Sequence, residues 1–363
     1  DRIVDRATVD GCACTDFNIV TNAHATHLGN FQPAGFRRLV TKSIGTQHNT
    51  AVHDNTIADP DVVNQADVRT QVPVIANAAV LADHTITFFR AKPGQYLEPA
   101  KRKCGKLHVV DIGIPDKVLE EIGPRCCLNG PDEFARSVPV PGEQSHKYSR
   151  GSALMISGGP WNTGAARLAA VSALRVGAGA VTMAASEAAL PVLANHLTAV
   201  MLKRADNGRD IGKLLHDKRI TACAIGPAAG VGHDTVEKVL AVLDAGCGVV
   251  LDADALTSFE GNSQILFDAI RARPERPVIL TPHEGEFARL FKSVDVSGES
   301  KWQRTVEASK ASGAVVVYKG SDTVIADIDG RCAINANAPF WLATAGSGDV
   351  LTGLCLGLMA QGM

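Results

Sequence analysis

Ala343-Thr344-Ala345-Gly346-Ser347-Gly348-Asp349 is followed by a mostly apolar run from Val350 to Met359. The run is long enough for about two to three helical turns, so we expect a helix to begin at the glycines. A helix N-terminus offers unpaired N–H groups and a partial positive charge, which suits a phosphate group. Asp349 would then lie beside that phosphate, placed to take a proton from an attacking hydroxyl. A Gly-rich loop in which Asp349 only caps the helix is the alternative.

The composition is that of an ordinary soluble chain. The 363 residues include 45% apolar and 20% charged residues, and the length allows two domains. The net charge of −2 argues against a nucleic-acid partner, and no apolar stretch is long enough to predict a membrane span. The nine cysteines are scattered and show no metal-ligand spacing. We therefore expect no protein metal site and reduced thiols in a cytoplasm.

From His146 to the C-terminus, predicted strands and helices alternate. Strands are expected over 153–157, 180–184, 222–225, 248–251, 278–280 and 314–318, and helices over 163–176 and 235–243. Strand after helix after strand predicts an α/β fold with a parallel sheet and helices on both faces. Such sheets bind ligands at the carboxyl ends of their strands, where polar and glycine-rich segments follow in this sequence.

Three of these segments suit the binding of a small molecule. Thr163-Gly164-Ala165 would let a helix N-terminus approach a ligand closely, although tight helix packing explains it equally well. The loop from Gly226 to Gly232 would line a ligand with backbone atoms, or form a plain turn. Asp252 and Asp254 follow the next strand, where they would bind Mg²⁺ through water or a ribose, or cap a helix.

Two further segments follow the last strands. His283, in Thr281-Pro282-His283-Glu284, would hydrogen-bond a substrate amide or hydroxyl, or serve only the local structure. Lys319-Gly320-Ser321-Asp322-Thr323 joins two β-prone runs. It predicts either a nucleotide-binding turn with a phosphate-facing lysine or a simple hairpin.

Taken in this order, the segments from His146 onward resemble the NAD(P)H-hydrate dehydratase family, which is similar to ribokinase-type kinases. The resemblance implies a ribokinase-like fold and a repair reaction on NADH or NADPH hydrate. ADP or ATP phosphorylates the new hydroxyl of the S form, and elimination then restores the ring. Mg²⁺, a nucleotide and a small-molecule substrate are implied, as is a homo-oligomer. The choice between ADP and ATP, and the choice between NADH hydrate and NADPH hydrate, stay open.

The resemblance also implies roles for individual residues. Asp349 would be the base and a substrate contact, and a second group would line the hydrate site: Ala165, Gly226, Gly230, Gly232 and His283. The nucleotide would be held by Lys319, Gly320, Ser321, Asp322, Thr323, Gly346 and Gly348.

The sequence departs from the family pattern at two places. Ala228 stands where the family usually has a glycine, and its methyl group would crowd a backbone that needs a close approach or a positive φ. The family usually continues beyond Met363, so part of the support of the nucleotide pocket would be missing if this is the true end.

Residues 1–137 are interpreted as a partial domain, joined by a linker over 138–145 to the dehydratase domain at 146–363. The segments Ala79 to Phe88, Lys92-Pro93-Gly94 and Val110 to Pro115 resemble the end of an NAD(P)H-hydrate epimerase domain. This implies a truncated Rossmann-like α/β domain, recognisable from about residue 72. The earlier family motifs are absent and residues 1–70 resemble nothing recognisable, as in a faulty gene model. We therefore expect epimerase activity to be lost.

Two other functions are compatible with the sequence. The glycine–aspartate element is shared with kinases of vitamin precursors, which would release a stable phosphorylated product. A non-catalytic nucleotide-binding remnant is the second alternative.

Overall fold

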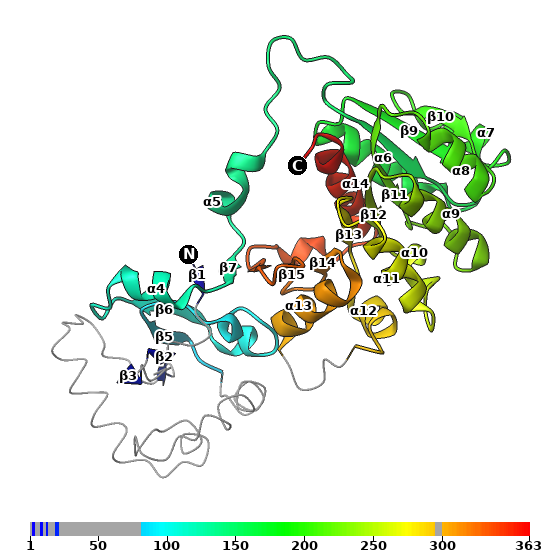
Figure 1. The fold of residues 1–363 in the computed structure, drawn as a ribbon. Helices are drawn as coiled ribbons and strands as arrows, with labels where there is room; N and C mark the ends of the chain where they lie inside the picture. Colours follow the sequence, from blue (N-terminus) through cyan, green and yellow to red (C-terminus); the bar gives the residue numbers. More distant parts are fainter. Residues whose placement is uncertain (1, 4–7, 10–11, 14–18, 22–80, 295–299) are drawn as a thin grey trace. The chain divides into compact units, whose positions relative to one another are not determined.

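The computed structural model describes residues 2–3, 8–9, 12–13, 19–21, 81–294 and 300–363 (Figure 1). Most of the stretch 1–70, interpreted above as unrecognisable, lies outside these residues. The chain divides into two compact units, one formed by residues 1–128 with 298–301 and the other by 129–297 with 302–363. The domain boundaries given above, at 137 and 146, stay predictions.

The first unit contains short strands around a parallel pair. Strand β5 (His84–Phe88) pairs in parallel with β6 (Lys106–Val110) and antiparallel with β4 (Ile19–Thr21). Strand β5 lies within the segment Ala79 to Phe88, and β6 ends at Val110, where the segment Val110 to Pro115 begins. The unit's other elements are β1 (Arg2–Ile3), β2 (Thr8–Val9), β3 (Cys12–Ala13), η1 (Pro93–Gln95), η2 (Ala100–Lys103), α4 (Asp116–Ile122) and β7 (Cys126–Leu128).

The second unit is built on a mostly parallel sheet. Its strands lie in the order β16-β15-β14-β13-β12-β11-β8-β9-β10, and all pairs from β14 to β10 are parallel. The two edge pairs β14–β15 and β15–β16 are antiparallel. The strands are β8 (Ser152–Ile156), β9 (Ala180–Ala185), β10 (Met201–Arg204), β11 (Ile220–Ile225), β12 (Gly248–Leu251), β13 (Val278–Leu280), β14 (Val315–Tyr318), β15 (Val324–Ala326) and β16 (Cys332–Ile334).

Helices follow the strands and pack on both faces of this sheet. Alternate residues of β8 enter two separate cores: Leu154 and Ile156 belong to one, Ala153 and Met155 to the other. This two-faced burial is what a parallel sheet covered by helices requires. The helices are α5 (Pro131–Phe134), η3 (Ala135–Ser137), α6 (Thr163–Arg175), α7 (Leu190–Ala194), α8 (Gly208–Leu215), α9 (His233–Asp244), α10 (Asp254–Thr257), α11 (Ser263–Arg271), α12 (Glu284–Leu290), α13 (Lys301–Ser312), η4 (Phe340–Leu342) and α14 (Ser347–Ala360).

The predicted elements of this unit are confirmed. Each predicted strand and helix from residue 153 onward is present, with its ends displaced by at most two residues. The predicted helix after the glycine turn begins at Ser347 as α14. Within the part of the chain that the structure describes, no helix is long and apolar enough to cross a bilayer.

Candidate active site at the strand ends

Five neighbouring parallel strands carry the predicted segments at their carboxyl ends. In the sheet these strands lie in the order β14, β13, β12, β11 and β8, so their ends meet along one edge. In that order, the strands lead into Lys319 to Thr323, Thr281 to His283, Asp252 to Asp254, Gly226 to Gly232 and the start of α6 at Thr163. The topology therefore gathers segments that lie far apart in the sequence.

Helix α14 presents its N-terminus beside these strand ends. Gly346 is the N-cap residue and has a left-handed φ of 89°, a conformation that glycine adopts without strain. A Cβ atom there would also lie 2.8 Å from Cδ1 of Leu168 on α6. Gly348 and Asp349 lie in the first turn, where backbone N–H groups have no intrahelical acceptor. This turn can bind an anion.

Asp349 has the environment of a general base. Burial raises the pKa of its carboxyl, and the nearby Asp252 carboxylate raises it further, while the Lys319 ammonium opposes both effects. A carboxylate with a raised pKa accepts a proton more readily than an ordinary aspartate.

Lys319 contributes the positive charge at this point. Its Nζ donates to Oδ1 of Asp252 at 2.7 Å, and the lysine side chain is 19% exposed. A Cβ atom on Gly348 would lie 3.7 Å from the same Nζ, so the ammonium lies beside the first turn of α14. A lysine and a helix N-terminus at one point can together bind a phosphate.

The rest of the 319–323 segment is the hairpin turn between β14 and β15. The Thr323 hydroxyl donates to the Gly320 carbonyl at 2.8 Å and accepts from the Gly320 N–H at 3.1 Å. Ser321 is exposed and Asp322 is buried. The structure therefore contains the hairpin that was the alternative interpretation, and Lys319 is the first residue of its turn.

The glycine loop after β11 lies against the segment that follows β12. Gly226 has a φ of 139°, and a Cβ atom there would lie 1.8 Å from the Asp252 carbonyl oxygen. The Gly230 N–H donates to Oδ2 of Asp254 at 2.9 Å, and the Gly232 N–H donates to the Ser258 hydroxyl at 3.1 Å. These bonds order the loop that we predicted to line the substrate.

Two alanines at this edge have backbone conformations that favour glycine. Ala228 has a φ of 52°, as the comparison of Gly226-Pro227-Ala228 with the family pattern suggested. Ala253, between the two aspartates, has φ 46° and ψ −117°. Ala253, and not Asp254, is the N-cap residue of α10, so Asp254 does not fill the capping position considered for it. Strained residues of this kind concentrate at functional sites.

His283 is the N-cap residue of α12. Its Nδ1 accepts hydrogen bonds from the N–H groups of Gly285 at 2.9 Å and Glu286 at 3.4 Å, and the Glu286 carboxylate accepts from the His283 N–H at 2.8 Å. The ring therefore has the structural role that was the alternative, while its side chain is 55% exposed. The preceding Pro282 carbonyl accepts from the Lys319 N–H at 2.8 Å. Ala165 lies in the first turn of α6, at the end of β8.

Thr352 was not recognised from the sequence. Its hydroxyl donates to Oδ2 of Asp252 at 2.7 Å, and both residues are almost completely buried. The available signal was a single hydroxyl within the apolar run of α14, because a buried hydroxyl needs a hydrogen-bond partner.

A magnesium ion fits this site as a partner of phosphate rather than of a protein cage. Among the described residues, no group of three or more histidine, cysteine, aspartate or glutamate side chains is placed to hold a metal. Both oxygens of Asp252 already accept hydrogen bonds. Mg²⁺ commonly keeps several waters and binds through substrate phosphates, so the phosphates would be its main ligands here.

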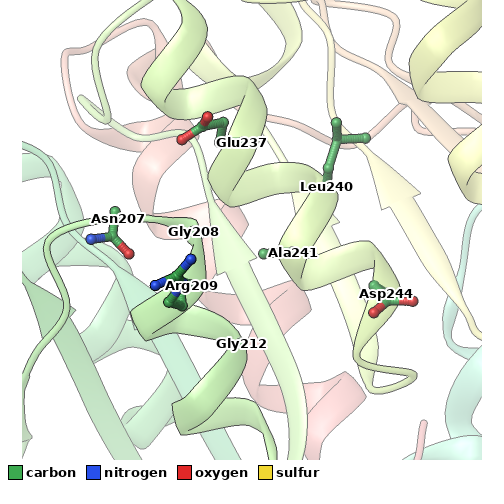
Figure 2. A pocket seen from close by; sticks show the side chains of 8 residues that line it. All are labelled: Asn207, Gly208, Arg209, Gly212, Glu237, Leu240, Ala241 and Asp244. Carbon is green, nitrogen blue, oxygen red and sulfur yellow. The ribbon is translucent and has the colours of Figure 1, made fainter.

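An open groove lies between α8 and α9 (Figure 2). It is lined from within 207–212 and 237–244, which include none of the predicted site residues. Asn207 caps α8 by accepting from the Asp210 N–H at 3.0 Å, and a Cβ atom on Gly208 would lie 2.9 Å from the Glu237 carbonyl oxygen. The groove is thus a seam between closely packed helices.

The order and direction of the strands define an α/β protein with a ribokinase-like fold. A ribokinase-like protein from Enterococcus faecalis has this fold, with a TM-score of 0.55 and 22% identity over 65% of this chain and 80% of its own. Residues 153–363 match the family model Carb_kinase, described as NAD(P)H-hydrate dehydratase. The chain therefore belongs to the NAD(P)H-hydrate dehydratase family.

Relatives with known names agree with this assignment. The ADP/ATP-dependent NAD(P)H-hydrate dehydratase from Bacillus subtilis, co-crystallised with ATP and Mg²⁺, is 30% identical, with a TM-score of 0.53 over 64% of this chain and 81% of its own. Bifunctional NAD(P)H-hydrate repair enzymes from Salinibacter ruber and Synechocystis are 35% and 32% identical. These two alignments cover 80% and 90% of this chain. The chain spans only 55% and 62% of the length of these two enzymes.

Proposed function

We propose that the second unit restores NADH or NADPH from the S form of its hydrate, using ADP or ATP and Mg²⁺. Asp349 takes the proton of the ring hydroxyl as its oxygen attacks the terminal phosphorus of the nucleotide. The bond from that phosphorus to the bridging oxygen breaks, and the nucleotide leaves with one phosphate fewer. Loss of the new phosphate ester, together with a proton from the neighbouring ring carbon, restores the double bond.

One observation carries the proposal: the N-terminus of α14 brings Asp349 and the Lys319 ammonium to the same point. Phosphoryl transfer needs mainly positioned reactants and stabilised charge. The helix N–H groups and the ammonium supply that charge, and the carboxylate with the raised pKa supplies the base. The geometry supports phosphoryl transfer, and membership of the NAD(P)H-hydrate dehydratase family names the reaction.

The remaining predicted residues are assigned by their place at the same edge. We assign Gly346, Gly348 and the 319–323 turn to the nucleotide. The 226–232 loop, Ala165 and His283 are assigned to the hydrate. Nδ1 of His283 caps α12 and Nε2 lies 3.2 Å from Oε1 of Glu286, so we assign the exposed surface of the ring to the hydrate.

The test is recovery of reduced-nicotinamide absorbance from purified S-NADH hydrate. Parallel reactions contain Mg²⁺ with ADP, with ATP or with no nucleotide. We expect recovery only with a nucleotide, and a loss of about 10²–10⁴-fold in Asp349→Asn.

The control is nucleotide binding by the Asp349→Asn variant, which should persist because the amide keeps the shape of the side chain. Phosphorylated hydrate that accumulates without elimination would instead favour a kinase of vitamin-precursor type. A folded protein that binds nucleotide and produces neither change would favour the non-catalytic alternative.

A further inference from the structure

A buried carboxylate lies underneath the proposed phosphate cradle. Asp252 is 2% exposed and directly follows β12. Its Oδ1 accepts from Lys319 Nζ and its Oδ2 from the Thr352 hydroxyl, both at 2.7 Å. One carboxylate therefore joins the ends of β12 and β14 to the second turn of α14.

The backbone around Asp252 fixes where this carboxylate lies. The Asp252 N–H donates to the Ile225 carbonyl at 3.2 Å, and the Asp252 carbonyl oxygen lies directly against Gly226. The next residue, Ala253, has a φ of 46°, which a non-glycine residue adopts only when its surroundings impose it. The carboxylate is thus held by the strand ends and not by a flexible loop.

The flexible side chain of Lys319 needs a fixed partner if its ammonium is to stay in one position. Its backbone N–H is held by the Pro282 carbonyl, but its side chain has four rotatable bonds. A free lysine side chain loses rotamer entropy when it is ordered. Here the ion pair orders it within the folded protein, so this cost does not fall on ligand binding.

We propose that Asp252 is a positioning residue: with Thr352, it holds the Lys319 ammonium against the first turn of α14, where a nucleotide phosphate binds. Asp252 itself does not touch the phosphate, because both of its oxygens face groups of the protein. The inference rests on the proposed function for the identity of the phosphate ligand, a nucleoside di- or triphosphate.

A double-mutant cycle on ADP binding tests this role. The variants are Asp252→Asn, Lys319→Met and the double variant, and calorimetry with Mg²⁺ gives each dissociation constant. Asp252→Asn should weaken ADP binding by roughly ten- to hundredfold, a size typical of side chains that orient a ligand-binding group. In the Lys319→Met background the same change should weaken binding by less than about threefold, since the two residues act as a unit.

Stability gives a second readout of the pair. Lys319→Met leaves a buried carboxylate without its cation, so it should lower the melting temperature. The double variant should melt above Lys319→Met, because the buried charge is gone. A merely structural aspartate would lower stability in both backgrounds.

If Asp252→Asn does not fold, variants of Thr352 test the same role. Thr352→Val removes one hydrogen bond to the carboxylate and leaves the ion pair in place. It should weaken ADP binding several-fold, and Thr352→Ser should restore most of that loss because it retains a hydroxyl.

Equal losses of affinity for Asp252→Asn with and without Lys319 would overturn the inference, and so would unchanged ADP binding in Asp252→Asn and Thr352→Val. A folded wild-type protein that binds neither ADP nor ATP would also overturn it. Coupled ADP binding without recovery of reduced nicotinamide would support the inference and contradict the proposed reaction. Recovery of reduced nicotinamide, with no coupling between Asp252 and Lys319 in ADP binding, would support the proposed reaction and contradict the inference.

Discussion

At the scale of single residues, the charges around Asp349 determine how the protein should respond to pH. Burial and the Asp252 carboxylate raise the pKa of Asp349 above the usual 3.8, and Lys319 lowers it. A base acts when deprotonated, so activity should fall as pH drops through this raised pKa.

We expect the acid limb of the kcat/KM profile to move in opposite directions in two variants. Asp252→Asn removes a negative charge and should shift the limb to lower pH, while Lys319→Met should shift it to higher pH. Profiles of the residual activity check this, and shifts of the same sign in both variants would contradict it. Because the folded-state pKa of Asp349 is raised, its ionisation opposes folding above that pKa. Asp349→Asn should therefore melt no lower than the wild type at neutral pH.

The strained loop after β11 offers a prediction about stability. The Ala229 N–H donates to the Gly226 carbonyl at 3.0 Å, which places Ala228 at the third position of a turn, with a φ of 52°. Ala228→Gly should stabilise the fold by about 0.5–1 kcal/mol. The relieved strain of about 1–2 kcal/mol exceeds the added entropy of the unfolded chain.

Urea unfolding measures the effect, and Ala229→Gly is the matched control. Ala229 has no positive φ, so its replacement should destabilise the protein by a similar amount. A destabilising Ala228→Gly would mean that the methyl group contributes contacts that outweigh its strain.

At the scale of elements, small residues set the distance between α6 and α14. A Cβ atom on Gly353 would lie 2.1 Å from the Ala169 carbonyl oxygen, and one on Gly357 would lie 2.6 Å from that of Ala173. The matched four-residue steps show that the two helices run parallel, so their N-termini lie at the same end of the sheet. Close packing of the two helices thus positions the first turn of α14.

Gly353→Ala should destabilise the protein by about 1–3 kcal/mol, because the methyl group meets backbone that cannot move aside. The control is Gly212→Ala, in α8, where a Cβ atom meets nothing within 4 Å. That change should stabilise by about 0.5–1 kcal/mol, the usual gain when alanine replaces a helical glycine. Chemical denaturation of both variants measures the difference, and equal effects would refute the packing argument.

At the scale of the whole molecule, the proposed activity belongs to one of the two compact units. The segments used for nucleotide and hydrate all lie within 129–297 and 302–363. In the first unit, the segments that resemble an epimerase include β5 and β6, but the earlier motifs of that family are absent from the sequence.

We therefore expect the protein to leave the epimerisation of NADH hydrate at its spontaneous rate. The measurement follows conversion of R- to S-hydrate with and without protein, without nucleotide, by chromatography. Recovery of reduced nicotinamide from S-hydrate in the same preparation shows that the protein is active. Faster conversion that is proportional to protein concentration would contradict the expectation.

The sequence by itself determined the fold class of the second unit and indicated the segments of its proposed site. Strand and helix periodicity is local, and glycine and aspartate mark strand ends and helix starts through backbone geometry, so both are visible without the fold. At Ala228 the family pattern indicated a close backbone approach or a positive φ, and the structure has a φ of 52°.

Only the tertiary structure decided which side chains meet. Asp252 contacts Lys319 across 67 residues and Thr352 across 100 residues of chain. No local pattern marks such pairs, because the order of the strands in the sheet decides which strand ends are neighbours. The same holds for His283, whose Nδ1 caps a helix, and for the raised pKa of Asp349, which depends on burial and on charges brought close by folding.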